Sequence, residues 1–109
     1  MNESPLFTKT YAFLLWLLPL TAGFPKYQRL GLARRLEDSA YNFYEAILHA
    51  AQTKDATRWL RTADAELGKT RFYLRLGKDL QAVSFGQYEH GAKMLVEIGK
   101  LLGGWLKQA

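Results

Sequence analysis

The sequence predicts an all-α protein: an antiparallel, up-and-down four-helix bundle formed by a single domain, residues 1–109. Three observations lead to this fold class. Apolar residues recur every three or four positions through most of the chain, which is the helical period. Capping and turn residues divide the chain into four such segments, joined by short polar connections that favour antiparallel neighbours. No stretch alternates polar and apolar residues for long enough to form a strand.

The first predicted helix runs from Pro5 to about Ala22. Ser4 stands in the N-cap position, and proline is tolerated at the first helical residue because an N–H there would be unpaired. Pro19 falls in the last turn, where we expect it to kink or fray the helix. Gly23 is expected to end the helix in a left-handed conformation.

The apolar segment of residues 11–20 could belong to a membrane-spanning helix or to a signal peptide. This segment is about half of the ~20 residues that cross a bilayer. A signal peptide starts with a positive region, whereas here Glu3 offsets Lys9. The chain also contains no cysteine, which fits a reducing cytoplasm. We therefore expect a cytoplasmic protein with a buried first helix and no membrane partner; secretion, or peripheral membrane binding through this helix, is the alternative.

The second predicted helix covers Tyr27 to Gln52 and the third Ala56 to Ala82. Each carries one apolar stripe at steps of three and four. The stripes are Leu32, Leu36, Ala40, Phe43, Ile47 and Ala50 in the second helix, and Leu60, Ala63, Leu67, Thr70, Leu74 and Gly77 in the third. Ser84 and Gln87 form a capping box that starts the last helix. That helix continues through Tyr88, Ala92, Leu95, Ile98 and Leu102 until Gly103 and Gly104 weaken it.

The third helix contains a sequence, ADAELGKT at residues 63–70, that ends like the nucleotide-binding P-loop. A phosphate-binding loop lies between a strand and a helix, but the helical spacing here continues from Leu67 to Leu74 without a break. Asp64 and Glu66 would also place two carboxylates beside the phosphates, where like charge is unfavourable. We interpret the match as accidental.

The excess of basic over acidic residues indicates a polyanionic partner. Fifteen basic and ten acidic residues give a net charge of +5, and arginine outnumbers lysine seven to four in residues 26–83. The guanidinium group can bind phosphate through two parallel hydrogen bonds. Arg71, Arg75 and Lys78 are spaced four and three, so they share one helix face. The candidate contacts from this pattern are Arg34, Arg35, Arg58, Arg61, Arg71, Arg75 and Lys78.

The basic and aromatic residues can also be explained without nucleic-acid binding. A row of cations can be an ordinary solvated helix face. Trp59 and Phe72 could stack on bases, but such residues more often belong to a core or a subunit interface. Because the first helix is apolar nearly all round, we expect self-association.

Catalytic and metal chemistry have little support in the sequence. The absence of cysteine excludes disulfides and cysteine-ligated metals. Glu45 and His49 are four apart and could share a metal with another helix, but the Glu-x-x-His spacing of di-metal bundles is absent. No serine has a histidine and a carboxylate in an evident arrangement. We expect a protein that is not an enzyme and that has no catalytic residue, metal or cofactor.

Several co-linear segments carry a family resemblance. They are Lys9–Leu17 (KTYAFLLWL), Phe24–Ser39 (FPKYQRLGLARRLEDS), Arg71–Leu80 (RFYLRLGKDL) and Gln87–Lys107 (QYEHGAKMLVEIGKLLGGWLK). In order and spacing they resemble the accessory variability determinant, or Avd, family of diversity-generating retroelements. That family is in turn similar to four-helix proteins encoded in intervening sequences of 23S ribosomal RNA genes. The resemblance extends from Leu6 to the end of the chain.

The resemblance implies a fold, an assembly and a function. Avd proteins are four-helix bundles that assemble as a pentameric barrel with a basic surface. They bind RNA or DNA and the retroelement reverse transcriptase, and they support mutagenic cDNA synthesis without covalent chemistry. By position, the family's basic segments correspond to Arg71, Arg75 and Lys78, and to Lys26 and Arg29 at the start of the second helix. The alternative is an interaction protein of the intervening-sequence type, without a reverse-transcriptase partner.

Overall fold

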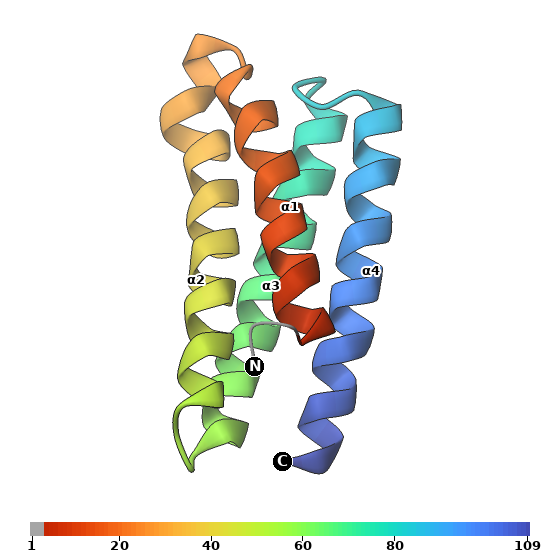
Figure 1. The fold of residues 1–109 in the computed structure, drawn as a ribbon. Coiled ribbons are helices and arrows are strands. Elements are labelled where there is room, and N and C mark those ends of the chain that lie inside the picture. Colours follow the sequence, from red (N-terminus) through yellow and green to blue (C-terminus); the bar gives the residue numbers. More distant parts are fainter. Residues whose placement is uncertain (1–3) are drawn as a thin grey trace.

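Four α-helices form the protein in a computed structural model that describes residues 4–109. The helices are α1 (Pro5–Ala22), α2 (Arg34–Ala51), α3 (Ala56–Asp79) and α4 (Phe85–Gln108), with the short helices η1 (Lys26–Gln28) and η2 (Arg29–Ala33) before α2. Figure 1 shows the four helices side by side, each running opposite to the one before it. Residues 4–109 contain no strand. The predicted all-α class and the predicted bundle are confirmed for this part of the chain.

The core lies between the four helices and uses the stripes that the sequence predicts. Every predicted stripe residue of α2 and α3 is buried, including Leu36, Ile47 and Leu60 at 0% exposure. Burying such a side chain stabilises the fold by about 1.5–3 kcal/mol. On α4 the core residues are Gly91, Leu95, Ile98 and Leu102, whereas Tyr88 and Ala92 are only partly buried. The helix is therefore rotated slightly from the expected orientation.

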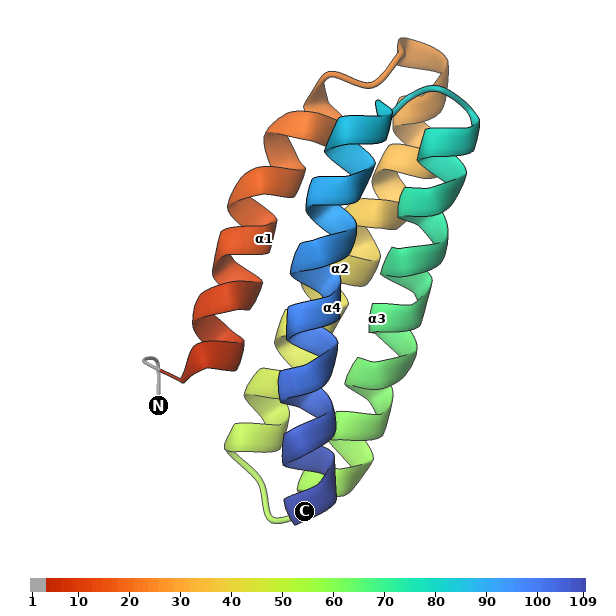
Figure 2. The ribbon, with the colours of Figure 1, turned by 90° about the vertical axis from the view of Figure 1, so that its right-hand side faces the viewer.

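The first helix is shorter than α3 and α4, with 18 residues against 24. It packs against α4 and α2, and in Figure 2 it lies beside the upper part of α4. Its inner side buries Phe13 and Leu17, whereas Tyr11 and Leu15 on its outer side are 66% and 60% exposed. Among residues 4–109, no helix combines the length and the apolar character that crossing a membrane requires.

The start of the second helix differs from the prediction of one α-helix from Tyr27 to Gln52. The chain first forms the 3-10 helix η1 and the π-helix η2, and regular α-helix begins only at Arg34. The guanidinium Nε of Arg29 donates to the carbonyl of Phe24 at 3.2 Å and ties this segment to the preceding turn. The wider π-helical turn changes the helical phase. Leu32 and Ala33, adjacent in sequence, are consequently both buried.

The third helix ends at Asp79, three residues before the predicted end at Ala82. Gln81 adopts a left-handed backbone conformation with φ of 66°. The N–H of Ala82 then donates to the carbonyl of Gly77 at 2.8 Å, and the N–H of Gln81 donates to that of Lys78 at 3.0 Å. This is the Schellman arrangement, which usually has glycine where Gln81 stands. The sequence therefore lacked the residue that normally marks this helix end.

One glycine prediction was wrong. Gly23 has a φ of −90°, so it is not left-handed; its N–H and that of Phe24 bond instead to the carbonyls of Leu20 and Thr21, three residues back. Phe24, only 1% exposed, then inserts into the core. Helix α4 continues past Gly103 and Gly104 to Gln108. Packing of its apolar side outweighs the cost of about 1 kcal/mol for each glycine.

Candidate nucleic-acid interface

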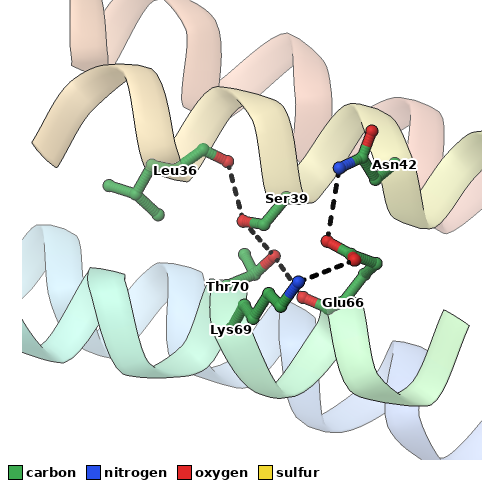
Figure 3. Close-up of polar contacts among 6 residues, drawn as sticks. All are labelled: Leu36, Ser39, Asn42, Glu66, Lys69 and Thr70. Atoms are coloured by element: carbon green, nitrogen blue, oxygen red, sulfur yellow. Dashed lines mark hydrogen bonds and ion pairs between the residues drawn. The ribbon is translucent and has the colours of Figure 1, made fainter. Parts of the chain in front are cut away.

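The supposed P-loop is an ordinary stretch of α3. Residues 63–70 lie inside the helix, and Thr70 is buried against α2. Its hydroxyl donates to the Ser39 hydroxyl at 2.8 Å, and Ser39 donates to the carbonyl of Leu36 at 3.1 Å (Figure 3). Lys69 pairs with Glu66 at 3.0 Å. The lysine and the threonine that would contact phosphate are thus both used within the bundle, and the sequence interpretation is correct.

The cations Arg71, Arg75 and Lys78 lie on the flank of α3 that is next to α4. Because α3 is uninterrupted from Ala56 to Asp79, these residues occupy successive turns of one helix face. Arg71 and Arg75 are exposed. Within residues 4–109, no carboxylate lies within 4.0 Å of either guanidinium group. Among these residues, neither charge is neutralised by an ion pair.

Arg71 is positioned by a glycine on the neighbouring helix. Its guanidinium group extends across to α4, and a Cβ atom at Gly99 would overlap its Nη2 atom. The absence of a side chain at Gly99 leaves a notch that the guanidinium group occupies. Arg71 therefore presents its charge at the seam between α3 and α4.

Lys78 also leans onto α4. Its ammonium group lies 4.6 Å from the ring centroid of Tyr88, a cation–π distance, and 3.5 Å from the carboxylate of Asp79. The lysine side chain is 28% exposed. A cation–π contact of this kind contributes about 0.5–1 kcal/mol at an exposed site. Lys78 is accordingly more constrained than Arg75, which lies between it and Arg71 along the helix.

The other predicted contacts on α3 lie at its opposite end. Arg58 sits 5.2 Å from the centroid of Trp59, which is itself stacked on His49 at 4.3 Å. Arg58 is 20 residues from Lys78, so the two ends of this row are about 30 Å apart at 1.5 Å per residue. Arg61 is exposed one turn further along than Arg58. These residues do not form one compact patch with Arg71, Arg75 and Lys78.

The predicted contacts before and at the start of α2 have different surroundings. Lys26 is exposed in η1, and Arg29 bonds to the backbone as described. Arg34 lies 4.0 Å from Asp38, one turn ahead on the same helix. Arg35 lines a hollow at the seam between α2 and α3, together with Lys69 and Tyr73. The structure thus divides the nine predicted residues among several faces.

Three lysines on α4 were missed by the sequence analysis. Lys93, Lys100 and Lys107 are seven residues apart, so they lie in one row along the helix, and all three are exposed. The seven-residue spacing of these lysines, which equals about two helical turns, was visible in the sequence. The lysines lie outside the most basic region of the chain, however. These lysines add exposed basic residues on the helix next to α3.

Within residues 4–109, the pair Glu45 and His49 gains no third metal ligand. Both line a shallow hollow with Trp59 and Glu66 between α2 and α3. Among residues 4–109, no group of three histidine, aspartate or glutamate side chains gathers in a position to bind a metal.

The sequence matches the family described as bAvd-like over residues 6–109, nearly its whole length. The chain belongs to the bAvd-like family. Avd is the accessory variability determinant of diversity-generating retroelements, and the family is of an accessory, non-catalytic type. The match covers all four helices of this bAvd-like chain. No curated protein matches the chain.

Proposed function

We propose that this bAvd-like protein is a non-catalytic accessory protein of a diversity-generating retroelement. In this role it binds the template RNA or the cDNA, together with the retroelement reverse transcriptase, and supports mutagenic cDNA synthesis in the cytoplasm. The observation that carries the proposal is the family match over residues 6–109. The guanidinium groups of Arg71 and Arg75, neither of which has a carboxylate partner among residues 4–109, supply the phosphate-binding chemistry.

We further propose that the binding unit is a homopentamer. One chain carries a net charge of +5, and five chains together carry 5 × 5 = +25. A larger positive charge strengthens binding to a polyanion through the release of counterions. The exposed apolar side chains Tyr11 and Leu15 on α1, with Tyr41 and Tyr44 on α2, offer surface for contacts between subunits.

Binding to RNA tests the first part of this proposal. Replacing both Arg71 and Arg75 by alanine removes two phosphate contacts, so the slope of log affinity against log salt should fall by about 1.4–1.8. We expect weaker binding at every salt concentration, measured by fluorescence anisotropy with a labelled RNA. Thr57→Ala and Thr62→Ala, on the same helix, form the matched control. Wild-type affinity in the arginine variant would exclude this face as the binding site.

A pull-down with the reverse transcriptase of the proposed retroelement tests the second part. We expect the two proteins to co-purify after nuclease treatment, since the proposal includes a direct contact. Co-purification that disappears on nuclease treatment would show that nucleic acid alone links them. RNA binding without any polymerase contact would instead favour an interaction protein of the intervening-sequence type.

A further inference from the structure

A small apolar hollow lies at the seam between α3 and α4. Its volume is about 190 Å³, and its lining comprises Arg71, Leu74, Tyr88, Ala92, Leu95 and Val96. Pockets for drug-sized ligands have volumes of about 300–1,000 Å³, so this hollow is too small for such a ligand. It has room for a single flat ring. Arg71 is the only charged residue in the lining.

One wall of the hollow is aromatic. Tyr88 lines it, and the ammonium group of Lys78 lies 4.6 Å from the centroid of the same ring. Aromatic side chains on which bases stack are the usual device for binding single-stranded nucleic acid, because every base has a π-face. On the open side, the polar edge of a stacked base would remain in water.

Two cations of α3 lie at or beside this hollow. Arg71 lines it, with its guanidinium group in the notch at Gly99, and Lys78 lies outside the lining, with its ammonium group beside the Tyr88 ring. They are seven residues apart on α3, about 10 Å along the helix axis. Arg75, exposed, lies between them. An apolar, aromatic-walled hollow lined by Arg71, with Lys78 nearby, complements a nucleotide, whose flat base is flanked by phosphate groups.

We propose that this hollow receives one unpaired base of a single-stranded nucleic acid, stacked on Tyr88, with an adjacent phosphate bound by Arg71. This inference rests on the proposed nucleic-acid binding and specifies its substrate as a single strand. A duplex keeps its bases paired and stacked inside, so it can offer only its phosphates to Arg71, Arg75 and Lys78. The hollow therefore gives the protein a preference for unpaired strands without sequence readout.

Two substitutions with opposite effects on the hollow test the inference. Tyr88→Leu keeps the wall apolar but removes the stacking surface, whereas Ala92→Leu fills the hollow from α4. For both variants we expect the affinity for a single-stranded RNA to fall roughly 5- to 150-fold, the range for loss of one stacked base. The affinity for the same RNA annealed to its complement should stay within about twofold. Binding is measured by anisotropy, and circular dichroism verifies folding.

Two glycine-to-alanine substitutions on α4, one at the notch and one as a control, test the position of Arg71. Gly99→Ala places a methyl group where the guanidinium group lies, and the flexible arginine can move away with little effect on stability. We expect the salt dependence of log affinity to become shallower by about 0.7–0.9, the contribution of one phosphate contact. Gly103→Ala is the matched control, because among residues 4–109 no atom outside its own helical backbone and its chain neighbours lies within 4 Å of the added Cβ. Its salt dependence should equal that of the wild-type protein.

Three results would overturn the inference. Unchanged single-strand binding by both Tyr88→Leu and Ala92→Leu would exclude a base from the hollow, while the proposed function would stand. Loss of the oligomer in the Ala92→Leu variant, measured by light scattering, would assign the hollow to a neighbouring copy of this chain. Absence of binding to any strand by the wild-type protein would contradict the proposed function, and this inference with it.

Discussion

At the scale of single residues, Gly91 on α4 leaves room for the indole ring of Trp16 on α1. A Cβ atom at Gly91 would lie 2.6 Å from the ring carbon Cη2 and 3.0 Å from a methyl group of Leu74. The indole ring packs against Phe13 and His90, with ring centroids 5.8 and 5.5 Å away, so it has little freedom to move. Glycine at this position therefore sets how closely the two helices approach.

Substituting this glycine should destabilise the fold. We expect Gly91→Ala to lower the free energy of unfolding by about 1–3 kcal/mol, as overpacking of a core does. Gly104→Ala, on the same helix with no atom within 4 Å of its Cβ, should raise it by about 0.5–1 kcal/mol, since alanine favours the helix. Urea unfolding followed by circular dichroism measures both values. A stabilised Gly91→Ala variant would contradict the close contact with Trp16.

At the scale of elements, the turn between α3 and α4 combines two capping motifs. Gln81 closes α3 in a left-handed conformation, and Ser84 and Gln87 open α4 with a capping box. The Gln87 N–H donates to the Ser84 hydroxyl at 3.0 Å, and the Ser84 N–H donates to the Gln87 side chain at 2.9 Å. Backbone groups that would otherwise be unpaired at the end of α3 and the start of α4 are thereby hydrogen-bonded within a short connection. This connection fixes α4 beside α3.

Glycine at position 81 should stabilise this turn. A left-handed conformation costs a non-glycine residue about 1–2 kcal/mol. Glycine avoids this cost, but it also gives the unfolded chain more conformational freedom, which offsets part of the gain in stability. We expect Gln81→Gly to raise the free energy of unfolding by about 0.5–1 kcal/mol, measured by thermal unfolding. Gln52→Gly is a suitable comparison, because Gln52 ends α2 with a φ of −110° and gains nothing from glycine. Equal effects of the two substitutions would contradict this account.

At the scale of the whole molecule, the uncharged outer side of α1 distinguishes this bundle from a typical soluble monomer. Tyr11 and Leu15 lie one turn apart on that side, and the only charged residue of α1, Lys9, pairs with Glu97 at 3.2 Å. A contiguous exposed apolar surface on a small protein marks an interaction site. The proposed self-association would cover it.

The mass of the assembly in solution tests this prediction. Five copies of a 12.5 kDa chain have a mass of about 62 kDa, which we expect for the wild-type protein by light scattering. The double variant Tyr11→Gln and Leu15→Gln should shift the mass toward that of one chain, because it removes apolar area from the subunit contact. Thr62→Gln, exposed on α3, should leave the mass unchanged. A wild-type protein of 12.5 kDa would exclude the pentamer.

The amino-acid sequence by itself determined the number of helices, most of their bounds, and the core. The reason is that helical periodicity and capping residues are local: the stripe through Leu60 and Leu67 and the box at Ser84 can be identified without knowing any neighbour. Family membership was likewise readable, because it depends on co-linear segments from Leu6 onward. The helix end at Gln81 was not, because a glutamine there carries no local signal for a left-handed turn.

Only the tertiary structure decided which charges act together. Whether Arg71 and Lys78 point into solvent or across a seam depends on how far α3 and α4 are rotated about their axes, and packing of the whole core sets that rotation. The notch at Gly99, the ring of Tyr88 and the hollow between them come from two helices brought together by folding. The physical reason is that residue spacing determines which side chains share one face of a single helix. A binding site between two helices also depends on how those helices are rotated and positioned relative to each other.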